Sequence, residues 1–142
     1  MRLKFNVESE IKKKLTEEQL KLVLFKSMVK MMELANINCP VDTGRLRNSI
    51  VLDPAEPGYS NYILSDGVDY GISVEFGTHP HLVSAENLKG WARRVLKDKN
   101  LAYPVAAKIA KFGTEAQPFM RPALDQVKNI WIKRYAEQVL KK

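Results

Sequence analysis

The chain has 142 residues, the size of one ordinary domain, and we expect residues 1–142 to fold as a single domain around one core. Its 45% apolar and 27% charged residues argue against disorder, and no apolar run approaches the roughly 20 residues of a membrane-crossing helix. Cys39 is the single cysteine. It excludes an internal disulfide, and we expect a small buried side chain there. The charged residues after Met1 predict that a secretory signal is absent.

The net charge of +7 is unevenly distributed. Residues 1–50 carry +4, residues 51–88 carry −6 with no Lys or Arg, and residues 89–142 carry +9. Complementary charge of this kind sets the partner and orientation in an assembly. The pattern therefore raises the hypothesis that the acidic part of one subunit faces the basic part of another.

A long N-terminal helix is predicted to begin at Thr16, where Thr16 and Gln19 form a capping-box pattern, and to end before Pro40. We expect its buried face to hold the apolar residues at helical spacing. These are Ile11, Leu15, Leu22, Phe25, Val29 and Met32. Residues 46–52 are expected to begin as a helical turn and finish as a strand, although the periodicity there is ambiguous. The breaker-rich residues 53–61 are expected to form an exposed hairpin arm.

Two strands are expected next, at residues 62–64 and 68–76. The second alternates apolar and polar residues, and its buried face is expected to hold Val68, Tyr70, Ile72, Val74 and Phe76. Helices should then begin after Ser84 and near Pro104, the latter ending at Gly113. The last helix should open near Pro122 with an apolar stripe that ends at Val139. Its members are Met120, Leu124, Val127, Trp131 and Tyr135. Because the tripeptide Phe-Gly-Thr at residues 76–78 and 112–114 would end a strand once and a helix once, we do not interpret it as a repeat.

Three short blocks lie on these elements: Pro-Val-Asp-Thr-Gly-Arg-Leu-Arg-Asn-Ser at 40–49, Glu-Phe-Gly-Thr at 75–78 and Pro-Phe-Met-Arg-Pro-Ala at 118–123. With them the chain resembles the tail-completion, or head-tail joining, proteins of long-tailed double-stranded DNA phages and proviruses. The likeness spans roughly residues 10–137, and residues 82–113 form a helical insert that is variable in such proteins. The matching residues are Pro40, Asp42, Thr43, Gly44, Arg45, Leu46, Arg47, Ser49, Glu75, Phe76, Gly77, Thr78, Pro118, Phe119, Arg121 and Pro122.

The resemblance implies a structural virion protein and not an enzyme, without catalytic residues, cofactor or metal. It implies a ring of identical subunits, formed alone or only on a template, that contacts other neck and tail proteins at the head-tail junction after assembly in the host cytoplasm. From this resemblance together with the elements above, we expect an α+β fold with a small antiparallel sheet packed against the long first and last helices. In the turns, Gly44 and Gly77 would allow tight geometry and Asp42 would accept backbone hydrogen bonds. Arg45 and Arg47 would then pair with acids such as Glu75.

Three alternatives remain open. Asp42-Thr43-Gly44 is also the tripeptide of retroviral-type aspartic proteases, in which two aspartates share one proton, but a helix and Pro40 precede it and Arg45 follows it. His79 and His81 could face one zinc ion, although no third ligand is signalled nearby. Sequence-independent DNA binding by the basic C-terminal helix is the third. Its cations are Lys128, Lys133, Arg134, Lys141 and Lys142.

Overall fold

The computed structural model describes residues 2–4, 14–54 and 62–141. It confirms the α+β fold. In chain order the elements are strand β1 (Arg2–Lys4), helices α2 (Glu17–Asn38) and α3 (Arg45–Asn48), strands β2 (Ile50–Pro54) and β3 (Tyr62–Asp66), helices α4 (Gly71–Phe76) and α5 (Ala85–Val95), the 3₁₀ turn η1 (Lys99–Leu101), helices α6 (Ala102–Phe112) and α7 (Met120–Gln126), the π-helical turn η2 (Val127–Trp131) and helix α8 (Ile132–Leu140).

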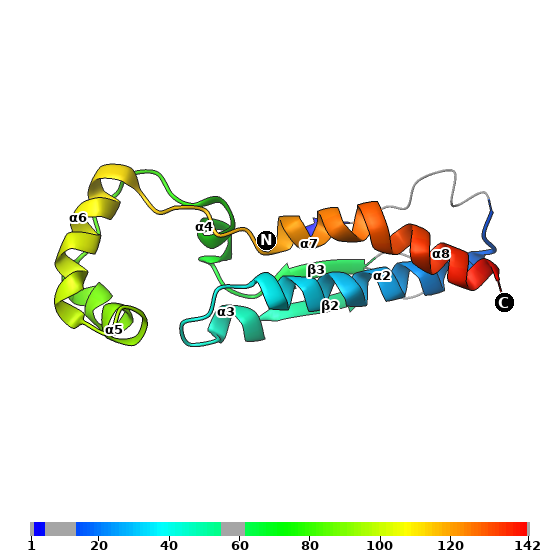
Figure 1. Cartoon of the computed structure of the whole chain (residues 1–142), viewed down its shortest axis with the longest axis horizontal. Helices are drawn as coiled ribbons and strands as arrows, with labels where there is room; N and C mark the ends of the chain where they lie inside the picture. The colour runs from blue at the N-terminus through cyan, green and yellow to red at the C-terminus, as the bar shows by residue number, and fades with distance from the viewer. Residues whose placement is uncertain (1, 5–13, 55–61, 142) are drawn as a thin grey trace.

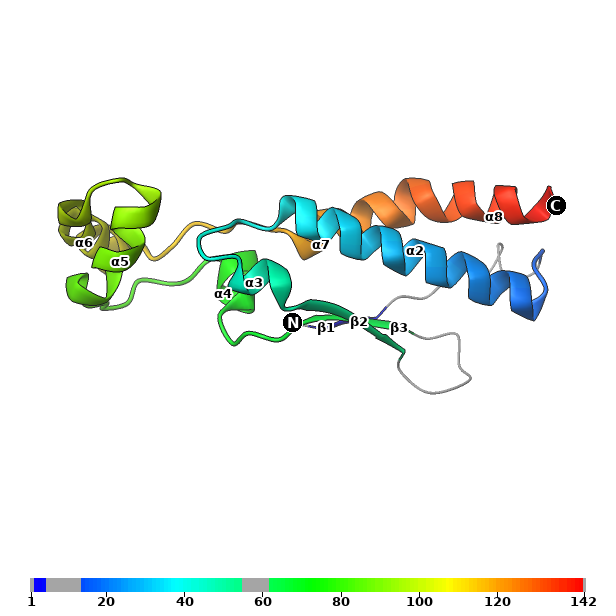
Figure 2. The same cartoon turned by 90° about the horizontal axis from the view of Figure 1, so that it is seen from below.

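Helix α2 lies in the middle of the molecule, between the sheet and the last helices (Figure 2). The sheet is antiparallel with strand order β1-β3-β2, and Leu52 of β2 lies opposite Leu64 of β3. Helices α7 and α8 run antiparallel to α2 along its length (Figure 1). The described core therefore collects side chains from the sheet, α2 and the last helices.

The predicted start of α2 is confirmed, because the Thr16 hydroxyl accepts a hydrogen bond from the Gln19 amide and the Gln19 side chain accepts one from the Thr16 amide. The predicted face of this helix is only partly right, since Leu15 and Met32 pack against the core but three other members do not. Leu22, Phe25 and Val29 are 38–47% exposed. The buried residues of α2 are Val23, Leu24, Ser27, Met28, Met31 and Ala35. Because α2 carries apolar side chains on two faces, periodicity alone does not select the one that packs. Ile11 lies outside the described residues.

The strand expected at residues 68–76 is also wrong, because residues 71–76 form helix α4. Its buried positions are Gly71 and Glu75, whereas Ile72 and Phe76, expected inside, are 55% and 50% exposed. Strand β3 covers the expected residues 62–64 and extends to Asp66. Residues 55–61, most of the expected arm, lie outside the described part of the chain.

The last helix departs from its expected stripe after Val127. Met120 and Val127 are buried as expected, but Ile132 and Ala136 take the buried positions in place of Trp131 and Tyr135, which are partly buried. The physical reason is the π-helical turn η2, which contains one more residue than an α-helical turn. The residues that face the core are therefore shifted by one position after it. Val139 is buried again near the end.

Residues 82–113, which we call the insert, form helices α5 and α6 as expected, and the rest of the described chain is the body. The insert lies beyond one end of the body and is joined to it by two extended segments (Figure 1). No residue between 77 and 118 belongs to the described hydrophobic core. Among the described residues, no helix is both long enough and apolar enough to cross a membrane.

Candidate assembly site

The three blocks meet at one end of the body. The first block contains the turn after α2 and helix α3, and it ends one residue before β2. The second block ends α4, and the third begins α7. In Figure 1 these segments lie together at the end of the body from which the insert leaves. The sequence placed the blocks far apart along the chain, and the fold brings them to one joint.

Glu75 links the second block to the third. Its side chain is 2% exposed. One carboxylate oxygen accepts hydrogen bonds from the amides of Phe119 (2.8 Å) and Met120 (3.0 Å), and the other accepts one from the amide of Arg121 (2.9 Å). The first amides of a helix have no partner within the helix, and the helix dipole favours an anion there. Glu75 therefore caps α7 from a distant part of the chain.

The expectation that Arg45 or Arg47 pairs with Glu75 is wrong. A carboxylate that already accepts three backbone hydrogen bonds inside the core has little room left for a guanidinium. Both arginines lie on α3 and are exposed, and neither forms an ion pair within the described residues. Sequence reasoning missed the role of Glu75 because its partners are main-chain amides, which carry no residue signal.

Asp42 of the first block holds the insert. Its two carboxylate oxygens accept hydrogen bonds from Nε and Nη2 of Arg94 on α5, both at 2.7 Å. This two-point geometry is the strongest that an arginine and a carboxylate form, and the hydrogen bond from Arg94 lowers the pKa of Asp42. The expected turn role of Asp42 is wrong, since it is Thr43 whose hydroxyl accepts a hydrogen bond from the Arg45 amide, at 3.5 Å.

The other members of the first block build the frame. Leu46 is 6% exposed and belongs to the core, and Gly44 has the expected positive φ of 80°. Ser49 donates from its hydroxyl to the Leu46 carbonyl (2.8 Å), and its own carbonyl accepts from the Gly67 amide (3.2 Å). Pro40 follows Cys39, which is the C-cap residue of α2. Cys39 is buried as expected, and burial raises the pKa of its thiol.

The two Phe-Gly-Thr copies bind each other at the base of the insert. Each ends a helix, and Gly77 and Gly113 both have φ of 74°. Thr78 and Thr114 then exchange backbone hydrogen bonds of 3.1 and 3.3 Å, and their hydroxyls lie 3.0 Å apart. We call this pairing the clasp. The prediction that one copy ends a strand is wrong, and the identical tripeptides were the signal that could have revealed it.

Phe76 and Arg121 form an exposed pair beside the clasp. The Arg121 guanidinium carbon lies 4.9 Å from the centre of the Phe76 ring, a cation–π distance, and Phe76 is 50% exposed. By contrast, Phe119 of the third block is fully buried. Pro118 precedes it on the exposed segment, and Pro122 lies in the first turn of α7 as expected. The blocks thus combine buried fold residues with an exposed aromatic residue.

The histidines and the surface grooves offer little chemistry at this joint. His81 and His79 are exposed, and Nδ1 of His81 lies 2.9 Å from the His79 carbonyl. Across residues 2–4, 14–54 and 62–141 no three His, Cys, Asp or Glu side chains gather as metal ligands would. Two shallow grooves of about 290 and 410 Å³ run along α2, away from the joint.

No protein-family model matches this chain, and neither a curated protein nor a solved structure matches it significantly. The function is therefore argued from the site and from the three blocks.

Proposed function

We propose that this protein is a structural virion subunit of a tailed phage or provirus, which forms a ring at the junction between the DNA-filled head and the tail. In this role it contacts other copies of itself and other neck and tail proteins. It catalyses no reaction and needs no cofactor. Assembly takes place in the host cytoplasm before the protein becomes part of the virion.

The observation that carries the proposal is the set of contacts that the residues of the three blocks form. Their polar residues hold the frame together: Glu75 caps α7, and Asp42 ties the insert to the body. Their exposed residues, such as Phe76, lie at the end of the body beside a protruding insert. A joint stabilised in this way and surrounded by exposed apolar side chains suits a subunit that docks onto other proteins.

The protease interpretation of Asp42 gains no support from its surroundings. The shared-proton state of the protease dyad needs two carboxylates in contact. Asp42 instead faces Arg94, which favours its ionised form.

Sequence-independent DNA binding is the second candidate, because Lys128, Lys133 and Lys141 of the last helical segment are exposed. Arg134 lies over the Trp131 ring, with its guanidinium carbon 5.1 Å from the ring centre. Lys142 lies outside the described residues. Binding through phosphate contacts would weaken steeply with salt. A gel-shift titration at low salt that detects no complex would remove this candidate.

Electron microscopy of lysates from the parent phage with this gene deleted tests the proposal directly. We expect DNA-filled heads and separate tails to accumulate, and we expect a plasmid copy of the gene to restore joined particles. Normally joined particles in the deletion lysate would overturn the proposal.

A further inference from the structure

The insert exposes large apolar side chains and buries few of its own. Ala92 and Ala102 are its buried hydrophobic residues. Its exposed ones, at 37–92% of their surface, are Leu82, Val95, Leu96, Leu101, Tyr103 and Phe112. Two short helices with so little core do not make a stable unit by themselves. Apolar exposure on this scale marks a surface that another protein covers.

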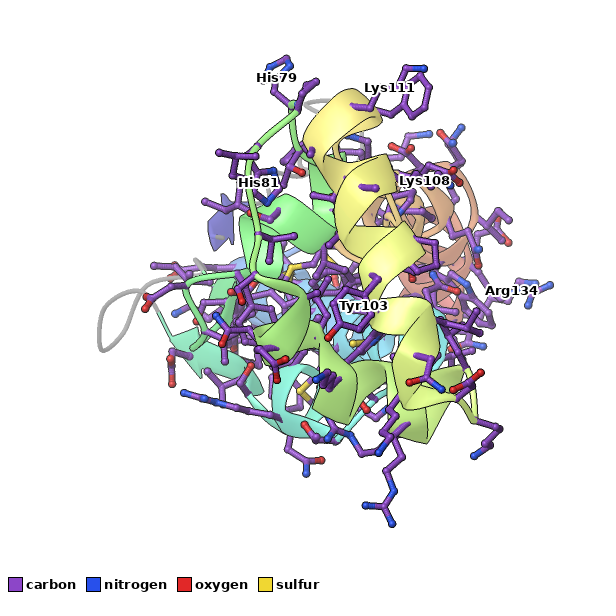
Figure 3. The ribbon with its side chains drawn as sticks, turned by 90° about the vertical axis from the view of Figure 1, so that its left-hand side faces the viewer. His79, His81, Tyr103, Lys108, Lys111 and Arg134 are labelled. Atoms are coloured by element: carbon purple, nitrogen blue, oxygen red, sulfur yellow. The ribbon has the colours of Figure 1, made fainter. Side chains whose placement is uncertain are left out.

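The contacts to the body leave this surface open. They include the clasp, the ion pair between Arg94 and Asp42, and the hydrogen bond from the His81 amide to the Ile109 carbonyl, which holds one connecting segment against α6. Figure 3 views the insert from outside the molecule, with Lys108 and Lys111 on the side of α6 away from α5. The outer side of the insert therefore faces solvent in the isolated subunit.

The charge of the insert indicates what covers it. Residues 82–113 hold seven Lys or Arg and two acids. Lys89, Arg94 and Lys108 are engaged in ion pairs, whereas Arg93, Lys99 and Lys111 are exposed and form none within the described chain. A partner of opposite charge with apolar surface would complement the insert.

The chain itself carries such a surface. Residues 48–81 hold five acids and no Lys or Arg. Asp66 and Glu75 are buried, whereas Asp53 and Asp69 are exposed. Ile72 and Phe76 are four residues apart on α4 and share one face of the helix, and Asp69 lies in the turn two residues before the helix begins. We call these three residues the α4 face. Ile72 and Phe76 are half exposed although the core of the same subunit lies beside them. Arg121 lies at the Phe76 end of this face, and Asp69 at the opposite end.

We propose that the insert of one copy docks on the α4 face of the next copy. The inference rests on the proposed ring and names its contact surfaces. Because the two surfaces differ, the contact is heterologous, and repeating it generates a ring when the rotation closes. Burial of Phe112 and its neighbours supplies the association energy, and the cations of the insert set the orientation against Asp69.

Site-specific photocrosslinking in assembled particles tests the contact. Phe112 is replaced by a photoreactive phenylalanine in an otherwise complete phage, and Ile130, which is 50% exposed on the body, is replaced in a matched control. We expect irradiation to give a covalent dimer in which position 112 is linked to residues 69–76 of another copy, and position 130 to leave those residues unlabelled. Crosslinks from position 112 to a different protein, to DNA or to other parts of the chain would overturn the inference.

Charge reversal provides a second test, in the deletion strain. We expect one variant with Arg93→Glu, Lys99→Glu and Lys111→Glu, and another with Asp69→Lys, to join at least tenfold fewer heads and tails than wild type. The combination of all four changes should recover most of that loss. Equal thermal midpoints must show that each variant is folded.

The two proposals fail in different ways. If both charge variants restore joining as well as wild type, the insert contact is wrong while the joining function stands. The same conclusion follows if the combined variant is as defective as each parent. If the deletion itself leaves particles joined, the proposed function is wrong.

Discussion

Replacing Glu75 with glutamine removes the negative charge but keeps the size of the side chain. One of the two oxygens becomes an NH₂ group, which faces backbone N–H donors instead of accepting from them. Since the site is 2% exposed, water cannot replace the lost hydrogen bonds. We expect Glu75→Gln to lower the free energy of unfolding by about 2–4 kcal/mol, measured by urea denaturation.

Glu115→Gln is the matched control for Glu75→Gln. Glu115 pairs with Lys108 at the surface, and its side chain is 84% exposed. We expect its replacement to change the unfolding midpoint very little. Equal stability of the two variants would show that Glu75 does not hold α7 in place.

The pKa of Asp42 gives a prediction about pH. Because Arg94 lowers this pKa below 3.8, the ordinary aspartate value, the folded state binds the proton more weakly than the unfolded state. The stabilisation is therefore complete above the ordinary aspartate range and is lost as the pH falls through the lowered pKa. In an NMR titration of the carboxyl carbon, we expect the Asp42 midpoint to move upward in Arg94→Gln. An unchanged midpoint would contradict the ion pair.

At the residue scale, the sequence identified the polar residues but not their partners. Asp42, Arg45, Arg47 and Glu75 were all recognised as important, and simple charge pairing joined the arginines to Glu75. The fold instead gives Glu75 the main-chain amides of α7 and gives Asp42 an arginine 52 positions away. Contacts of this kind depend on tertiary structure, which spacing along a chain does not encode.

Among the secondary-structure elements, α2 offers the clearest comparison of two faces. Met28 is fully buried, whereas its neighbour Val29 is 38% exposed. We expect Met28→Ala to cost about 2–5 kcal/mol of stability and Val29→Ala less than about 1 kcal/mol. Thermal or urea unfolding of the two purified variants measures the difference. A larger loss of stability for Val29→Ala would show that α2 packs through the face that the sequence pattern predicted.

The clasp depends on glycine at two identical turns. Gly113 has φ of 74°, and a Cβ there would overlap the carbonyl oxygen of Thr78. We expect Gly113→Ala to open the clasp and to make the two connecting segments cleavable by a protease, because a local contact that opens exposes its backbone. Limited proteolysis followed by mass spectrometry locates the cuts.

Gly67→Ala is the control for the clasp. A Cβ at Gly67 meets Ser49 at an ordinary distance of 3.8 Å, and the residue lies outside the clasp. Its digestion pattern should match that of wild type. Cleavage of both variants at the same rate would mean that the clasp does not protect the connecting segments.

Element boundaries were predicted best where local chemistry determines them. The Thr16 capping box, the stop before Pro40 and the Gly113 end of α6 are all confirmed. The alternation at residues 68–76 wrongly predicted a strand. Residues 71–76 form α4 instead, which places Glu75 against the start of α7 and Gly71 against Asp66. Tertiary contacts outweigh a short strand pattern there.

The insert contributes no residue to the described core of the body, so the whole molecule should tolerate its removal. Replacing residues 80–112 with a short Gly-Ser linker should leave the body folded, with helical circular dichroism and a cooperative unfolding transition. The shortened protein should nevertheless fail to complement the gene deletion if the insert forms the subunit contact. Loss of the cooperative transition would show instead that the body needs the insert to fold.

The α+β architecture was predictable from helical periodicity at both ends of the chain and from the strand at residues 62–64, although the second expected strand, at residues 68–76, was wrong. The position of the insert was not predictable. Its helices were expected, but their separation from the body follows from the clasp and from the absence of insert residues from the described core. The repeated Phe-Gly-Thr tripeptide was a signal for the clasp, whereas the separation from the core has no pattern along the sequence.

The separation of insert and body also divides the two tryptophans of the chain, since Trp91 lies on α5 and Trp131 between α7 and α8. Each part thus contains its own intrinsic fluorophore. Lys30 and Arg134 both lie over the Trp131 ring, at 4.6 and 5.1 Å from its centre, so the emission of Trp131 reports on the approach of α2 to the last helix. In a Trp131→Phe variant, Trp91 is the one remaining tryptophan. Its emission spectrum can therefore report on the surroundings of the insert during assembly without an added dye.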